Sequence, residues 1–477
     1  MPSQTGEGEE DTRFRLRDQI ENERFERCLS EFLELYPEPA EGMANTERLT
    51  REVEERGWRG GWDATGRFLF PLARLSDSYG VWTCETVLAW PGSPLRGACR
   101  DLLVPLHERN AALARELARG FAQSDNPELQ SIAASVYWYP AWRQNLEPED
   151  FDTLQTLAAS SHLGVRYGLL RSLHIDEGEE PLGNRGRAFD LVMGVDVEDN
   201  KGAADEMASL FAGLHPLFPL DSLGEDEVRQ LLQKLVPVGE IEDYHIGQLL
   251  TLITARLPME TLNFLLARLD YAVQADGKTQ AGEFYSPVPF DTEDKSPFDL
   301  SPLAAHPGYL EALRNLCEQN LGARGAKALW LPRLFRLVSL GCGPVALRVL
   351  DEWLGEVEND EERLNSASLL LSCAPSTWVF ENVEFVTKMP RDAHVISRDC
   401  FHEVGGHLWM SLHGGTFMRA AFEAAPCHVH QRDESQRNAA MLRLGSPERE
   451  FYEWLSKDAM REIADELKRD VELADER

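Results

Sequence analysis

One amphipathic stretch, SHLGVRYGLLRSLH at residues 161–174, constrains the fold of this chain more than any other feature of the sequence. Its apolar residues recur at three- and four-residue spacing, which predicts a helix with one wide apolar face. That face comprises Leu163, Tyr167 and Leu170, with Val165, Leu169 and Leu173 beside them. Ser161 is expected to cap the helix, and Gly164 and Gly168 are expected to let another helix approach closely. Such a face is too wide for a single neighbour, so we expect packing against helices on several sides.

Similar helix starts recur along the chain and predict a repeat. They lie at 93–106, 126–139, 161–174 and 200–213, anchored at Leu95, Leu129, Val165 and Ala203, with spacings of 34, 36 and 38 residues. Partner helices are expected between them at 110–123, 148–160 and 184–195. A helix, a tight turn, a second helix and a linker fill about 35 residues, which is the period of stacked helical hairpins.

This period and order of helices resemble those of HEAT-type repeats, whose second helices often begin with an apolar residue followed by Arg. Leu95–Arg96 and Val165–Arg166 match that opening, whereas Leu129–Gln130 and Ala203–Ala204 depart from it. The resemblance covers about 90–215 and implies an all-α fold, a right-handed α-α superhelix. The Trp-containing C-terminal helices and the closing FYEWL helix resemble the C-terminal repeat region of bacterial STAND-type signalling NTPases used in defence, although the chain holds no nucleotide-binding domain.

The sequence predicts four segments. Residues 1–12 are polar and acidic and are expected to be disordered, and 13–274 are expected to form a first helical-repeat lobe, beginning with helices at 13–36, 45–58 and 66–76. Residues 275–308 contain five prolines and no helical period, which predicts a linker or an irregular or β-hairpin insertion. Helical pairing resumes over 309–477, and the charged last helix suits a terminal cap.

Composition excludes several classes of function. The chain of 477 residues has a formal net charge of −33, which disfavours nucleic acid and anionic membrane surfaces and favours a protein partner with a basic surface. Its eight cysteines form no CxxC pair, and we expect free thiols in a reducing compartment. The N-terminus has neither the basic nor the apolar region of a signal peptide, so a cytoplasmic location is expected.

An aromatic cluster, YWYPAW at 137–142, is the candidate partner-binding site. It contains Tyr137, Trp138, Tyr139 and Trp142. One interpretation is packing where the repeat bends at Pro140. The other is an exposed anchor for a partner, because Trp and Tyr dominate binding hot spots.

A His/Cys-rich segment at 394–430 supports a second hypothesis, a zinc-bearing protein or an enzyme. It holds His394, His402, His407, His413, His428 and His430, together with Cys400 and Cys427. Cys400, His402, Cys427 and His430 are the candidate zinc ligands, because thiolate and imidazole are the usual ones. His402 and His407 are five residues apart, not the four that a zincin helix requires.

A third hypothesis is nucleic-acid binding on an arginine stripe, for which Arg166, Arg171, Arg185 and Arg187 would have to line one face. No catalytic motif or cofactor-binding pattern is found, although a Ser–His–acid triad could be assembled from distant positions. The sequence therefore predicts a non-catalytic scaffold, adaptor or sensor that binds another protein.

Overall fold

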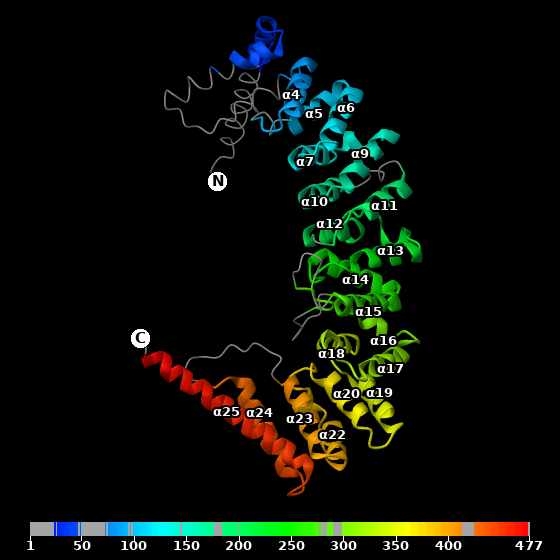
Figure 1. Cartoon of the computed structure of the whole chain (residues 1–477), viewed down its shortest axis with the longest axis vertical. Helices are drawn as coiled ribbons and strands as arrows, with labels where there is room; N and C mark the ends of the chain where they lie inside the picture. Colours follow the sequence, from blue (N-terminus) through cyan, green and yellow to red (C-terminus); the bar gives the residue numbers. More distant parts are fainter. Residues whose placement is uncertain are drawn as a thin grey trace, which may run out of the picture. The chain divides into compact units, whose positions relative to one another are not determined.

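The computed structural model of the chain is all-α (Figure 1). It describes residues 23–24, 26–45, 48, 72, 75–93, 96, 99–143, 146–175, 184–198, 200–275, 278, 284–289, 298–412 and 424–475. In these residues the only extended pairing is one antiparallel bridge between Lys278 and Phe284, in the region where a β-hairpin insertion was one expectation. No helix in the same residues has both the length and the apolar character needed to cross a membrane.

The chain divides into two compact units, Met1–Pro219 and Leu220–Arg477. The helices of the first unit are α4 (Asp77–Ala89), α5 (Cys99–Arg109), α6 (Ala111–Ala122), α7 (Pro127–Val136), α8 (Pro140–Arg143), α9 (Pro148–Ala158), α10 (Leu163–Ser172), α11 (Arg185–Gly194) and α12 (Lys201–Ala212). They form two layers: α4, α6, α9 and α11 contact one another in that order, and so do α5, α7, α10 and α12. The second layer consists of the four recurring helices, so the predicted stacking of hairpins is confirmed.

Asparagine caps set the starts of four helices in this unit. The side-chain oxygens of Asn110, Asn126, Asn184 and Asn200 accept hydrogen bonds from backbone amides of the first turns of α6, α7, α11 and α12, at 3.3, 2.9, 3.0 and 3.0 Å. Each cap satisfies an amide that the helix itself leaves unpaired. Helix α10 differs, because its N-cap is His162, with no side-chain cap bond, and not the expected Ser161.

The buried face of α10 is rotated from the expected one. Val165, Leu169, Leu170 and Leu173 are buried, whereas Leu163 is 45% exposed and Tyr167 is half-buried. The expected role of the glycines is wrong as well, because a Cβ on Gly164 or Gly168 would meet nothing within 4 Å. These glycines lie on the open side of the helix, and the neighbours α7 and α12 pack against its other side.

The second unit repeats the two-layer plan. Its helices are η2 (Leu220–Ser222), α13 (Glu225–Leu235), α14 (Tyr244–Arg256), α15 (Pro258–Gln274), α16 (Ser301–Ala304), α17 (Tyr309–Asn320), α18 (Ala326–Val338), α19 (Pro344–Gly355), α20 (Glu361–Leu371), α21 (Trp378–Glu381), α22 (Val383–Ile396), α23 (Arg398–Ser411), α24 (Pro426–Met441) and α25 (Pro447–Asp475). Helices α13, α15, α18, α20 and α23 contact one another in order, and α17 packs on α19. The long α25 pairs with α24 and also contacts α22.

The sequence had predicted that the segment 275–308 separates two lobes. In the structure it does not separate the two units, because the residues on both sides of it belong to the second unit. Its described part packs into that unit: Tyr285, Val288 and Phe298 are buried. The fully buried Arg268 of α15 donates hydrogen bonds to the carbonyls of residues 286 and 287, at 2.6 and 3.0 Å. A proline-rich segment without helical period can therefore be part of a core when a buried donor satisfies its backbone.

The N-terminal predictions are mostly untested. The segment 1–12 and most of the helices expected at 45–58 and 66–76 lie outside the described residues. Helix is present at 26–35, within the expected 13–36. Helix α4 had not been expected. Its sequence, DSYGVWTCETVLA, mixes β-branched and aromatic residues without a clear apolar stripe.

Candidate partner-binding site

A pocket of about 430 Å³ lies on the layer formed by α5, α7 and α10, and we call it the aromatic–arginine pocket. Its lining residues are Arg100, Ser135, Trp138, Tyr139, Tyr167, Gly168, Arg171 and Ser172. Two of these are charged and both are arginines. In a chain with 81 acidic and 48 basic residues, the described lining of this pocket contains no carboxylate.

The centre of the pocket is a contact between Trp138 and Arg171. The Trp138 side chain is 51% exposed, and the Arg171 guanidinium carbon lies 5.6 Å from its ring centroid. A guanidinium over an indole face is attracted by the ring quadrupole, and stacking leaves its N–H donors directed away from the ring. The arrangement offers a flat apolar surface beside a set of donors, which suits a planar or apolar group carrying an oxygen acceptor.

The turn after α7 places Trp138 in this position. The amides of Trp138 and Tyr139 donate to the carbonyls of Ser135 and Val136, both at 3.2 Å, and Pro140 then begins the short helix α8. The residue before a proline is disfavoured in the α conformation, so α7 ends here.

The buried Arg143 fastens this turn to α10. Its Nη1 donates to the carbonyl oxygens of Ser172, at 3.3 Å, and of His174, at the C-terminal end of α10. A cation at this end is favourable because the last carbonyls of a helix carry partial negative charge. The contact fixes α8 to the end of α10 and therefore Trp138 beside Arg171.

The structure separates the four aromatic candidates into two pairs. Tyr137 and Trp142 are buried at 1% and 0% exposure, and their rings meet edge to face at 5.9 Å. Trp142 also stacks on His107 at 4.5 Å, and burial lowers the pKa of that imidazole. Trp138 and Tyr139 line the pocket. The packing interpretation therefore holds for Tyr137 and Trp142, whereas Trp138 and Tyr139 remain the candidates for binding a partner.

Sequence reasoning missed Arg100 as a lining residue and assigned Tyr167 to the core. Arg171 had been considered only as part of an arginine stripe. One signal was present in the sequence, since Tyr167 and Arg171 are four residues apart on one helix and therefore share a face. What the sequence could not show was that this face is open.

The four arginines of the proposed stripe do not line one face. Arg166 is 6% exposed, and its Nη1 lies 2.6 Å from an Asp196 carboxylate oxygen. Arg171 lies on α10 of one layer, whereas Arg185 and Arg187 lie on α11 of the other. Arg187 stacks on Phe151, with its guanidinium carbon 5.6 Å from the ring centroid. This arrangement does not provide the basic track that a phosphate backbone requires.

The candidate zinc ligands are not gathered. Cys400 is buried on α23, where its thiol donates to the Asn365 side-chain oxygen at 3.7 Å, and burial raises the pKa of the thiol to about 11. His402 is exposed, and the exposed His430 meets Phe380 edge to face at 5.8 Å. Throughout the residues that the structure describes, no three His, Cys, Asp or Glu side chains are placed to hold a metal ion. His413 lies outside them.

Among the described residues, Ser209, His174 and Glu206 form a Ser–His–acid group whose geometry differs from that of a catalytic triad. Ser209 Oγ and Glu206 Oε1 lie 3.0 and 2.6 Å from the same nitrogen of His174, Nε2. A triad needs the acid on one ring nitrogen and the hydroxyl on the other, so that the imidazole can take the hydroxyl proton. Ser209 is also buried, and its hydroxyl donates to the Glu206 carbonyl at 2.6 Å. We assign this group to helix packing.

No protein-family model, curated protein or solved structure matches this chain.

Proposed function

We propose that this chain is a HEAT-like helical-repeat protein that acts as a non-catalytic adaptor or sensor, and that it holds a protein partner at the aromatic–arginine pocket. The observation that carries this proposal is the half-exposed Trp138 lying under Arg171 in a pocket whose described lining contains no carboxylate. Trp and Arg are the side chains most enriched where the binding energy of protein interfaces is concentrated.

The pocket is held in a form ready to bind. Arg143 fixes the turn that carries Trp138, and the buried side chains of Tyr137 and Trp142 hold the same turn to the core. A surface that is already ordered loses little conformational entropy on binding, so more of the contact energy appears as affinity. The partner's anchor is a planar or apolar side chain with a carboxylate or carbonyl oxygen that Arg171 can reach.

The remainder of the partner's surface is proposed to be basic. A net charge of −33 attracts positive patches over the Debye length, about 8 Å at physiological ionic strength, and speeds their encounter. The likeness to the repeat region of STAND-type NTPases leads us to propose a bacterial cytoplasmic signalling or defence complex as the setting.

Two matched pairs of variants test the pocket. Gly168→Leu fills it with a side chain whose Cβ meets no atom within 4 Å, and Gly164→Leu adds the same side chain on the same helix outside it. Trp138→Ala removes the anchor, and Trp90→Ala removes another tryptophan of the same unit that is 59% exposed. Each tagged protein is used to capture partners from extracts of the host, which are then quantified by mass spectrometry.

We expect at least one protein to be retained by the wild type and by the two control variants, and to fall by about tenfold or more with Gly168→Leu and Trp138→Ala, as is typical of a hot spot. Its association rate should fall as salt is raised. Absence of any retained protein, or equal retention by all variants, would contradict the proposal.

A further inference from the structure

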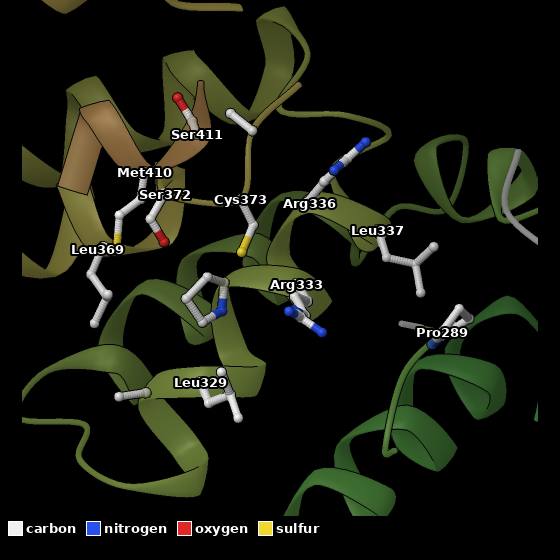
Figure 2. A pocket seen from close by; sticks show the side chains of 13 residues that line it. Pro289, Leu329, Arg333, Arg336, Leu337, Leu369, Ser372, Cys373, Met410 and Ser411 are labelled. Carbon is white, nitrogen blue, oxygen red and sulfur yellow. The ribbon is translucent and has the colours of Figure 1, made fainter. Parts of the chain in front are cut away.

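A second pocket, of about 460 Å³, lies in the second unit and is separate from the aromatic–arginine pocket (Figure 2). Helix α18 forms one side of it, and the C-terminal ends of α20 and α23 form the other. Its lining residues are Pro289, Ala328, Leu329, Pro332, Arg333, Arg336, Leu337, Leu369, Ser372, Cys373, Ala374, Met410 and Ser411. We call it the α18 pocket.

The lining of the α18 pocket combines an apolar surface with two cations. Pro289, Pro332 and Ala374 are buried, whereas Leu329 and Met410 are 51% and 40% exposed. Large apolar side chains left open to water at the rim of a pocket are typical of a surface that a ligand covers.

The two charged side chains in the described lining are both arginines. Arg333 and Arg336 are half-buried and lie between Leu369 and Met410 on one side and Leu337 and Pro289 on the other (Figure 2). The Arg333 guanidinium carbon lies 5.0 Å from the centroid of the Trp330 ring, a distance at which the ring attracts the cation. Among the residues that the structure describes, the lining of this pocket contains no carboxylate.

We propose that the α18 pocket docks a short acidic segment of another protein, with an Asp or Glu carboxylate at the arginines and apolar side chains on either side of it. Arginine suits a carboxylate because its parallel N–H donors match the two oxygens. The apolar lining on both sides requires flanking apolar groups. The pocket volume is within the range of sites that enclose compact ligands, about 300–1,000 Å³.

A peptide is favoured over a nucleic acid for two reasons. The apolar lining on either side of the arginines gives no contact to a repeating phosphate chain. The net charge of −33 repels an extended polyanion far more than it repels one or two carboxylates.

Cys373 provides a reporter of occupancy inside the pocket. It is half-buried in the lining, whereas the exposed Cys28 lies in the first unit. A ligand in the pocket therefore slows alkylation of Cys373 and leaves that of Cys28 unchanged, and this readout needs no substitution.

The experiment selects random short peptides displayed on phage against the full chain. Selected peptides are synthesised and their affinities measured by fluorescence anisotropy, with alkylation of both cysteines followed by mass spectrometry. Affinity is compared between the wild type, an Arg333→Gln/Arg336→Gln variant and a control variant, Arg348→Gln, whose arginine is exposed on α19 of the same unit. Thermal unfolding checks that the variants are folded.

We expect enriched peptides to combine Asp or Glu with large apolar residues, to slow Cys373 alkylation, and to lose about tenfold or more in affinity in the double variant but not in Arg348→Gln. Loss of the aromatic–arginine pocket through Trp138→Ala should leave their affinity unchanged. No enrichment, enrichment of neutral or basic peptides, unchanged affinity in the double variant, or unprotected Cys373 would each overturn the proposal. So would an oligonucleotide that protects Cys373 where no peptide does.

Discussion

Replacement of Arg268 by Met is expected to loosen one part of the second unit. Arg268 is fully buried, and its guanidinium donates to five carbonyl oxygens, those of Leu235, Val236, Val238, Ser286 and Pro287, at 2.6–3.0 Å. It also lies 4.8 Å from the centroid of the Tyr285 ring. Burial lowers the pKa of Arg268 to about 10, so the group remains charged at neutral pH. Its counter-charge is the partial negative charge of the carbonyls at the end of α13.

The magnitude follows from what the carbonyls lose. Those of Leu235 and Val236 keep a second donor, from the Val238 amide and the Tyr285 hydroxyl. The other three lose the one bond described for them. A buried acceptor without a partner costs about 1–3 kcal/mol, so three of them cost about 3–9 kcal/mol. Removing a buried ion returns several kcal/mol of desolvation, and we expect a net loss of about 2 kcal/mol, near the middle of the resulting range.

Hydrogen exchange measures this loss where it occurs. A net loss of about 2 kcal/mol should speed exchange of the amides of α13 and α15 up to about thirtyfold. Amides of α23 serve as an internal control, and Arg348→Met is the control variant because this arginine is exposed. A change of less than about twofold at α13 and α15 would show that Arg268 does not hold the segment 284–289 to these helices, and the reasoning would be wrong.

Three further predictions concern stability. Trp142→Ala should lower the free energy of unfolding of the first unit by about 3–5 kcal/mol and Trp138→Ala by less than about 1 kcal/mol, because only Trp142 is buried; equal losses in urea unfolding would contradict this. Gly168→Ala should stabilise α10 by up to about 1 kcal/mol, seen as a raised melting temperature, whereas a lowered one would reveal a close contact. Burial lowers the pKa of His407, whose Nδ1 lies 2.8 Å from Ser368 Oγ. The unfolded chain therefore takes up the proton first as pH falls below about 6.5. Wild type should lose stability between about pH 7 and 5 more steeply than His407→Gln, and parallel melting curves would refute this.

The aromatic cluster shows what a pattern can and cannot decide. Four aromatic residues within six positions indicate a strongly apolar turn, and the structure contains one. A turn presents its side chains in several directions, and neighbouring helices decide which of these are covered. Tyr137 and Trp142 point into the layer shared with His107, and Trp138 does not. That distinction separates a core residue from a residue that is open to a partner, and it depends on helices distant in sequence.

The sequence also did not reveal that arginines line the two pockets. A net charge of −33 gives the average field of the surface, but each pocket is lined by a few side chains from three helices or more. Arg100 and Arg171 are 71 positions apart in the sequence and line the same pocket because α5, α7 and α10 stack. A composition average cannot reveal a local excess of one sign when the contributing residues are so far apart.

The sequence by itself determined the all-α class and the positions of most helices, although not of α4, because apolar spacing and asparagine caps act within one or two turns of the chain. Tertiary structure alone decided where the core is open. Packing against neighbouring helices leaves the face of α10 with Gly168 open, so that Gly168 lines a pocket. Hydrogen bonds from Arg268 hold a proline-rich segment in the second unit. The reason is physical: a helix forms from local hydrogen bonds, whereas burial depends on which distant surfaces cover each face.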